Sequence, residues 1–471
     1  MNENKILRAG QLSVFVLLVG LIVYAILDDT LVDFIISEPY YGYSILLGII
    51  SLFLALLILH KSKTFPPSIV LFFSFLVVPF IGPPGNRVYE KLYGLFHGIH
   101  LSFSYPTLVW AVGTVALLAG ILFSYYLIPT GRAKKLVKWD LKRASLLAWG
   151  TVGFALFFTL FAIFKIGYIP LLSGDIDDVR TGYEAIVGDY PLKFSRLWLV
   201  AASLSSMLAF LMKPKRIYLL VVLVSCVALM IYGQRIYTFM VLVSFVLIYC
   251  KFRRPKLIYF GTFGLFIIVV FILYAEYRAG RSNSGLSVPE VVTLQLFGEW
   301  REYSLVVNDL KDSGDFYEED IFIGALSPIF PKQIWAVFGI DKNELIEEYS
   351  AVYVFGRRFD NPLLGIRLGT IGEAYAGYGM FYGVFLQLFV FGVIFGFLEK
   401  FYLNLNKEDA RLCLTCFLIS LFMYLPITTL YVTMAHAIFF GFFFVVFQVF
   451  GSYHEGKASR TSDAQVSMQQ A

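Results

Sequence analysis

Charge and cysteine are both scarce in this sequence. Charged residues make up 15% of its 471 residues and there are four cysteines, whereas hydrophobic residues make up 58%. All four cysteines fall within or at the ends of apolar runs, which excludes a disulfide framework in the polar loops. A soluble core cannot bury this much apolar surface, so the bilayer must solvate most of the chain. The sequence therefore predicts an integral membrane protein.

Ionisable side chains are missing from the interiors of the expected spans, apart from the ends of the spans and His436. Buried intramembrane charges are the usual markers of ion coupling and proton relays, so their scarcity argues against a transporter. His436 is expected to be a packing histidine.

Apolar runs that could cross about 30 Å of hydrocarbon number about twelve. They lie at 11–27, 43–60, 66–81, 106–128, 144–164, 193–212, 217–232, 236–250, 257–275, 379–399, 412–427 and 429–450. Basic residues concentrate in short loops such as 132–143, 213–216 and 251–256, which places these loops and both termini in the cytoplasm. The expected fold is an all-α polytopic integral protein of the cell membrane.

The polar segment 275–378 interrupts this pattern and divides the chain. The sequence predicts N-terminal transmembrane helices with short outer loops over 1–274, an extracytoplasmic helical insert over 275–378 between spans nine and ten, C-terminal transmembrane helices over 379–453 and a disordered cytoplasmic tail over 454–471. Within the insert, Ser287 and Glu290 fit a capping box that opens an amphipathic helix ending near residue 310. The segment 327–335 contains two prolines and is expected to be a loop.

The apolar run from 217 to 250 has 34 residues, too many for one helix and barely enough for two. Its break falls at Gly233-Gln234-Arg235, and two helices of about 15 residues would each rise only about 23 Å. The turn is therefore expected slightly below the outer membrane surface, in a cavity rather than in lipid. Arg235 at that depth needs an anionic partner, with a snorkelling interfacial arginine as an equally open alternative.

Arginines and carboxylates gather in the segments expected at the outer face. Guanidinium groups bind phosphate oxygens in a bidentate way, which suits a lipid diphosphate. The expected diphosphate or glycan contacts are Arg180, Arg235, Arg278, Arg281, Arg358 and Arg367. Sugar transfer also needs a carboxylate that takes the proton from the acceptor hydroxyl. Glu373 is the first candidate for this catalytic base, followed by Asp175 and Glu276, although each could instead be an ion-pair partner or a helix cap.

Two groups of residues have the chemistry of metal ligands. Asp175, Asp177 and Asp178 could offer oxygen ligands to a divalent cation, but an N-capping and solvation pattern is favoured. His97 and His100 are one helical turn apart, yet the sequence offers no evident third ligand. No metal and no other cofactor are therefore expected.

Four motifs mark this layout: IPLLSGDIDDVR after the fifth span, GQR at the helix break, YRAGR after the ninth span and GTIGEAYAGYGMFYG entering the tenth. In these motifs and in topology the chain resembles the bacterial oligosaccharide repeat-unit polymerases, the Wzy-type polymerases of O-antigen, capsule and exopolysaccharide. The resemblance implies a GT-C-like membrane glycosyltransferase that moves a growing glycan from undecaprenyl diphosphate onto the next lipid-linked repeat unit. It implies substrate contacts for Arg180, Arg235, Arg278 and Arg281, a role for Glu373, and no need for a metal.

The same resemblance implies partners and leaves alternatives open. The partners would be polyprenyl-diphosphate-linked oligosaccharides and membrane lipid, with a chain-length regulator and a flippase beside the enzyme and no nucleic acid. An O-antigen ligase-like enzyme would share the architecture and differ in its acceptor. A transporter of polysaccharide or lipid-linked sugars is disfavoured by the charge-free spans and the one-sided insert. A structural subunit of an envelope assembly is the remaining alternative.

Overall fold

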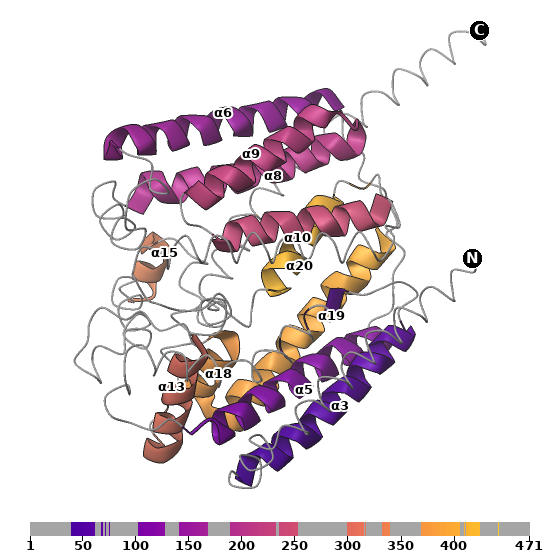
Figure 1. Ribbon diagram of the computed structural model, residues 1–471, viewed down its shortest axis with the longest axis vertical. Coiled ribbons are helices and arrows are strands. Elements are labelled where there is room, and N and C mark those ends of the chain that lie inside the picture. The colour runs from indigo at the N-terminus through magenta and orange to yellow at the C-terminus, as the bar shows by residue number, and fades with distance from the viewer. Residues whose placement is uncertain are drawn as a thin grey trace, which may run out of the picture. The chain divides into compact units, whose positions relative to one another are not determined.

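Figure 1 shows the computed structural model of the chain and labels its described helices. The described residues are 39–61, 67, 68, 71, 75, 102–127, 141–167, 189–231, 235–252, 299–314, 316, 332–339, 369–405, 409, 411–423 and 441. Within them every regular element is a helix. Four helical stretches are long and apolar enough to cross a membrane, namely Ser104–Leu127, Ala144–Lys165, Ser195–Met212 and Gly369–Asn404. The predicted helical, multi-pass membrane class is thereby confirmed at this level.

Most of the described helices lie on predicted spans. They are α3 (Pro39–Lys61), α5 (Ser104–Leu127), α6 (Leu141–Ile166), α8 (Asp189–Met212), α9 (Arg216–Ile231), α10 (Arg235–Phe252) and α20 (Arg411–Met423). The break expected at 233–235 is confirmed, because α9 ends at Ile231 and α10 begins at Arg235. The predicted spans 11–27, 66–81, 257–275 and 429–450 lie wholly or largely outside the described residues, so the number of about twelve remains a prediction.

The tenth predicted span differs from its expected bounds. A short helix α18 (Gly369–Tyr378) precedes it, followed without interruption by the π-helix η4 (Gly379–Gln387) and by α19 (Leu388–Asn404). Gly379 has a φ of +67°, a backbone conformation that L-residues with side chains adopt at a cost. This glycine therefore ends α18 and redirects the chain into the span. At the other end α19 continues five residues beyond the predicted limit of 399.

Two helices of the polar insert are described. The amphipathic helix α13 (Glu299–Ser313) falls in the segment predicted to be helical up to about residue 310. The short helix α15 (Lys332–Val337) corrects the prediction of a loop over 327–335. Proline fits the first turn of a helix, where its missing N–H is not needed, so Pro331 directly before α15 does not prevent this helix.

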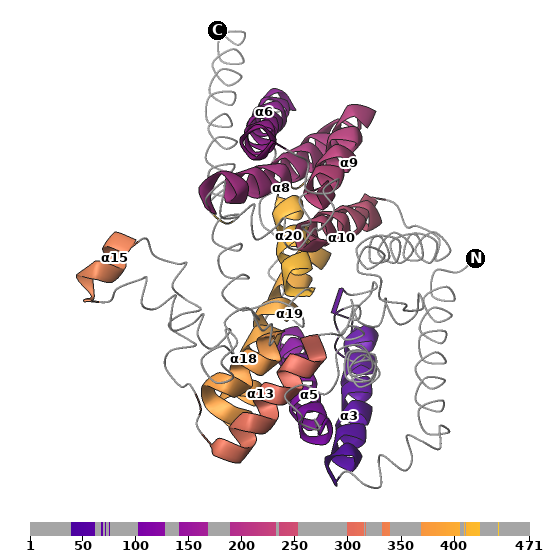
Figure 2. The same ribbon diagram turned by 60° about the vertical axis from the view of Figure 1, so that its left-hand side comes forward.

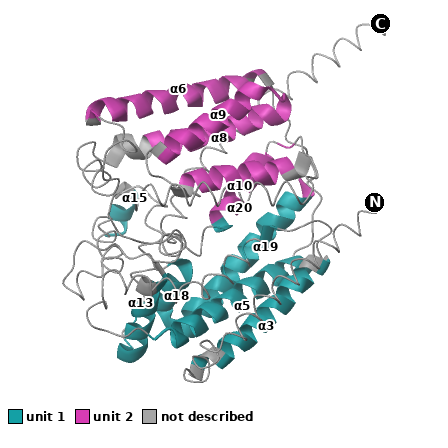
Figure 3. Ribbon diagram, viewed as in Figure 1, with its two compact units in different colours: residues 1–130, 255–403, 422–435 teal, residues 131–254, 404–421, 436–471 magenta. Residues whose placement is uncertain are grey.

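The chain divides into two compact units, drawn in teal and magenta in Figure 3. Unit 1 comprises residues 1–130, 255–403 and 422–435, and unit 2 comprises residues 131–254, 404–421 and 436–471. In unit 2, α8 packs against both α6 and α9. Phe154 of α6 stacks on Trp198 of α8 with ring centroids 4.9 Å apart.

The outer surface of α6 is apolar. Phe157, Leu160 and Phe164 are exposed by 62%, 63% and 87%, respectively. A contiguous row of large apolar side chains facing water would be an aggregation hazard, whereas the same row facing acyl chains is stable. This face therefore supports the membrane class independently of the hydropathy of the sequence.

In unit 1, α3 packs along α5, and glycines bring α5 and α19 into close contact. A Cβ atom on Gly120 would collide with the carbonyl oxygen of Phe389, and one on Gly392 would collide with the carbonyl oxygen of Leu117. Small residues allow the backbones of membrane helices to approach, and packing between helices replaces the hydrophobic effect that is missing in lipid. The glycines therefore hold α5 beside the span that carries α18.

Candidate functional site

The short helix α18 carries the candidate site of unit 1. Its sequence GTIGEAYAGY is rich in small residues, and its first nine residues are buried. Both boundaries are glycines of positive φ, +63° at Gly369 and +67° at Gly379. A Cβ on Gly383 of η4 would collide with the carbonyl oxygen of Ala374, so η4 lies directly against the backbone of α18. The sequence GEAYAGYGMFYG thus fixes a short helix against the start of the span.

Glu373 lies in the middle of this short helix and is 1% exposed. Its neighbours in the chain are Gly372 and Ala374, whose small size lets other segments approach the backbone at this point. Burying a carboxylate is costly unless it has partners, so natural proteins retain such groups mainly where they have a structural or chemical use. The burial of Glu373 makes it the best-supported candidate among the predicted catalytic residues.

A tyrosine cluster, made of Tyr40, Tyr105 and Tyr375, joins α18 to α3 and α5. The hydroxyl oxygens of Tyr105 and Tyr375 are 3.1 Å apart and share a hydrogen bond, although the residues are 270 positions apart in the chain. Tyr40 packs edge-on against Tyr105 with centroids 5.2 Å apart. The ammonium group of Lys311 lies 5.2 Å and 5.0 Å from the ring centroids of Tyr40 and Tyr105. A positive charge therefore sits at the edge of a cluster that contains two paired phenols.

The helix α13 is docked on the first turn of α5, as the second view shows (Figure 2). The hydroxyl of Tyr303 donates to the carbonyl oxygen of Pro106 at 2.9 Å, and the side-chain amide of Asn308 donates to that of Ser102 at 2.6 Å. Burial raises the pKa of Tyr303 well above its usual range, and the neighbouring phenols of Tyr375 and Tyr105 add to this effect. Tyr303 is thus a neutral hydrogen-bond donor that fixes the insert helix to the membrane helix.

Three aromatic residues pack together at the contact between α13 and α5. Trp110 of α5 packs edge-on against Trp300 and Tyr303, with centroids 5.3 Å and 5.4 Å away. The indole nitrogen of Trp110 donates to the carbonyl oxygen of Phe75 at 2.7 Å. The indole nitrogen of Trp300 is buried and has no hydrogen-bond partner among the described residues. These rings form a rigid support for the end of the bundle that carries Glu373.

The other predicted site residues are placed only in part. Arg235 is the first residue of α10 in unit 2, and its side chain lies outside the described residues. Asp175 and Glu276, predicted as further catalytic carboxylates, lie outside the described residues. The same holds for the predicted substrate contacts Arg180, Arg278, Arg281, Arg358 and Arg367. Their convergence with Glu373 therefore remains a prediction.

Sequence reasoning missed a buried polar cluster near the far end of the same span. Glu399 of α19 is fully buried and accepts hydrogen bonds from the backbone N–H and the hydroxyl of Ser68, at 2.5 Å and 3.1 Å. The hydroxyl of Tyr125 also donates to Glu399 at 2.5 Å. The adjacent Lys400 donates to the carbonyl oxygens of Ser124 and Tyr125 at 3.0 Å and 3.2 Å. The only sequence feature that indicated burial of the charged pair Glu399-Lys400 is that apolar and aromatic residues continue after it, in GFLEKFY.

The candidate metal ligands are not among the described residues. Asp175, Asp177, Asp178, His97 and His100 are outside the described residues. Among the residues that are described, no group of three or more His, Cys, Asp or Glu side chains could hold a metal ion. The absence of a metal thus remains a prediction for the chain as a whole.

Comparison with known proteins found no match to a family model, to a curated protein or to a solved structure. The class of this protein therefore rests on its own residues: a helical membrane protein with a buried carboxylate on a short helix at one end of an apolar span.

Proposed function

We propose that this chain is a membrane glycosyltransferase that polymerises undecaprenyl-diphosphate-linked oligosaccharide repeat units into a surface polysaccharide. In this proposal about twelve helices span the cell membrane, both termini are cytoplasmic and the insert over 275–378 lies at the outer face. The polymerisation reaction is proposed because four sequence motifs resemble those of the Wzy-type polymerases.

The observation that carries the proposal is the position of Glu373. The GTIGEAYAGYG run predicts this residue as a proton acceptor, and it is buried on a short helix that two glycines delimit. The π-helix that follows, η4, is a rare form that is frequently found at functional sites. The insert helix α13 packs on α18, so the carboxylate lies where the polar insert meets the membrane helices.

The proposed reaction uses Glu373 as the general base. The carboxylate accepts the proton of the acceptor hydroxyl while the hydroxyl oxygen forms a bond to the anomeric carbon of the growing glycan. The bond between that carbon and the diphosphate oxygen breaks, and its electron pair stays with the lipid diphosphate. The arginines Arg180, Arg235, Arg278 and Arg281 would stabilise this developing charge through bidentate hydrogen bonds. Release of the proton from Glu373 to solvent completes the cycle.

The test uses single substitutions in the native host. Arg235→Ala, Arg281→Ala and Glu373→Gln are compared by the ladder of surface glycan on a gel, with membrane levels of each variant measured in parallel. Glu373→Gln keeps the shape of the side chain but cannot accept the proton, and loss of a general base lowers the rate by about 10²–10⁴-fold. Arg216→Ala is the matched control, because Arg216 opens α9 at the end opposite to the break before Arg235.

The outcomes separate the candidate functions. Loss of the polymer ladder with a single repeat unit retained, at unchanged protein levels, supports a polymerase. Loss of every surface glycan, single repeats included, supports a flippase or a ligase instead. A normal ladder in both arginine variants would refute the proposed diphosphate contacts. A normal ladder in Glu373→Gln would refute the role of Glu373 as general base.

A further inference from the structure

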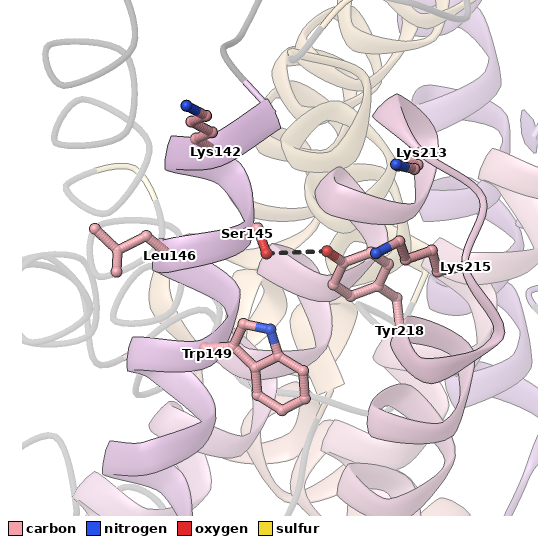
Figure 4. A pocket seen from close by; sticks show the side chains of 7 residues that line it. All are labelled: Lys142, Ser145, Leu146, Trp149, Lys213, Lys215 and Tyr218. Carbon is pink, nitrogen blue, oxygen red and sulfur yellow. Dashed lines mark hydrogen bonds between the residues drawn. The ribbon is translucent and has the colours of Figure 1, made fainter.

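A basic pocket opens in unit 2 between α6, α9 and the link that joins α8 to α9 (Figure 4). It has a volume of about 400 Å³, and its lining comprises Lys142, Ser145, Leu146, Trp149, Lys213, Lys215 and Tyr218. Lys142 comes from the start of α6, whereas Lys213 and Lys215 come from the link between α8 and α9. None of these seven described residues is acidic, so the lining carries a net positive charge.

The pocket has a fixed polar centre. The hydroxyl of Tyr218 donates to the hydroxyl of Ser145 at 3.0 Å, which ties α9 to α6. Tyr218 is buried, with 4% exposure, whereas the three lysines are exposed. Figure 4 shows Lys142 and Lys213 on opposite sides above this hydrogen bond. The helices are therefore held in place while the ammonium groups can reach a ligand.

The pocket changes from charged to apolar along α6. The apolar stretch of this helix begins at Ala144, two residues after Lys142. Leu146 and Trp149 line the pocket within this stretch and are 75% and 48% exposed. Seven residues of α-helix rise about 10 Å, so Trp149 lies about 10 Å deeper than Lys142 along the helix axis. Tryptophan prefers this depth, at the boundary between headgroups and acyl chains.

The lysines lie at the level where two spans leave the hydrocarbon. Lys213 directly follows the apolar stretch Ser195–Met212, and Lys142 lies two residues before that of α6. Cations at headgroup level above exposed apolar side chains match a ligand with a negative head and a hydrocarbon tail. A small soluble anion would use the lysines but would leave Leu146 and Trp149 without a function.

We propose that this pocket binds the phosphate headgroup of an anionic phospholipid, with an acyl chain lying along Leu146 and Trp149. The lysines attract the phosphate, and Tyr218 and Ser145 hold α6 and α9 at the separation that the headgroup requires. Basic pockets between membrane helices are a recognised form of lipid headgroup site. The proposal requires only the membrane class and does not depend on the proposed enzymatic activity.

The test measures lipid binding to the full-length protein in detergent by native mass spectrometry. Phosphatidylglycerol and phosphatidylcholine with identical acyl chains are titrated separately. Lys142→Gln, Lys213→Gln and Lys215→Gln are each compared with wild type. Lys165→Gln is the matched control, because Lys165 is an exposed lysine in the last turn of the same helix α6.

Wild type is expected to bind phosphatidylglycerol more tightly than phosphatidylcholine. Each pocket substitution is expected to weaken phosphatidylglycerol binding by about fivefold, which corresponds to about 1 kcal/mol per lysine near a membrane surface, with phosphatidylcholine binding unchanged. Lys165→Gln should bind phosphatidylglycerol as wild type does.

Three results would overturn the proposal. Equal binding of the two lipids by wild type would mean that the pocket does not recognise the headgroup charge. An equal loss in Lys165→Gln would show a general effect of net charge. Binding of inorganic phosphate to wild type as tightly as phosphatidylglycerol would show that the acyl chain contributes nothing, and would identify a site for a soluble anion rather than for a lipid.

Discussion

Gly383 offers the sharpest test of the architecture around Glu373. In η4 this residue has no side chain, and a Cβ atom there would be closer to the carbonyl oxygen of Ala374 than real Cβ contacts allow. The carbonyl belongs to the backbone, so no side-chain rotation can relieve the collision. Gly383→Ala must therefore push α18 away from η4, and Glu373 moves with α18.

The size of the effect follows from two opposing contributions. Replacing glycine by alanine inside a helix is favourable by about 0.5–1 kcal/mol, because the unfolded chain loses conformational freedom. Inserting a carbon atom into a closely packed position costs about 1–3 kcal/mol. The expected net loss relative to wild type is therefore about 0–2.5 kcal/mol, and relative to a glycine-to-alanine change at an open helical position it is about 1–3 kcal/mol. Displacement of a catalytic group by about 1 Å can lower a rate about 10²-fold, so activity should fall more than stability.

The assay is a thermal melt of the purified protein in detergent, together with the surface-glycan ladder. Gly150→Ala is the matched control, because a methyl group on Gly150 would meet no atom within 4 Å beyond its chain neighbours and the nearby backbone of its own helix. The control should melt at or above the temperature of wild type and keep a normal ladder. If Gly383→Ala melts as high as Gly150→Ala and also retains the ladder, the close packing of η4 on α18 does not exist.

Two further predictions concern the hydrogen bonds that fix α13 and α19. Tyr303→Phe should make the stability of the protein less sensitive to alkaline pH. Because burial raises the pKa of Tyr303 in the folded protein above its value of about 10 in the unfolded chain, the stabilisation that this difference provides is fully present below pH 10. Above pH 10 the unfolded phenol ionises first, and the stabilisation falls by at most about 1.4 kcal/mol per pH unit. Melting curves between pH 8 and about 11 check this slope, with the exposed Tyr43→Phe as control, and an unchanged slope refutes it. Tyr125→Phe should cost about 1–2 kcal/mol through its lost bond to Glu399, and much less once Glu399→Gln is present, whereas additive melting shifts would contradict the coupling. The exposed Tyr382→Phe is the control for this cycle.

Several elements followed from the sequence because they depend on local properties. Whether a segment is long and apolar enough to span a bilayer is decided within about twenty residues, so α5, α6 and α8 lie where the apolar runs predicted them. The break before Arg235 was equally local, since 34 apolar residues fit neither one helix nor two long ones. Glu373 was singled out as a candidate because its small neighbours are visible in the sequence, and its catalytic role remains a prediction.

The contacts around these elements were decided by the tertiary structure. Tyr105 forms a hydrogen bond with Tyr375, 270 positions later in the chain, and Ser68 forms one with Glu399, 331 positions later. Helical periodicity carries no information over such sequence separations. A charged residue at the end of an apolar run has the same local sequence whether it reaches water or a buried partner. Glu399 was therefore expected at the edge of the membrane span, and its burial depends on Ser68 and Tyr125.

The membrane class of this protein was thus determined by the sequence alone, because the free energy of transferring apolar surface out of water is roughly a sum over the individual residues. The positions of single groups within the bundle were not, because they require knowledge of which helices pack together. Gly120 and Gly392 permit a close approach of α5 and α19, but only the folded chain shows that each meets the backbone of the other helix. The basic pocket of Lys142, Lys213 and Lys215 exists for the same reason: two cytoplasm-predicted basic segments meet only when α6 packs along α8.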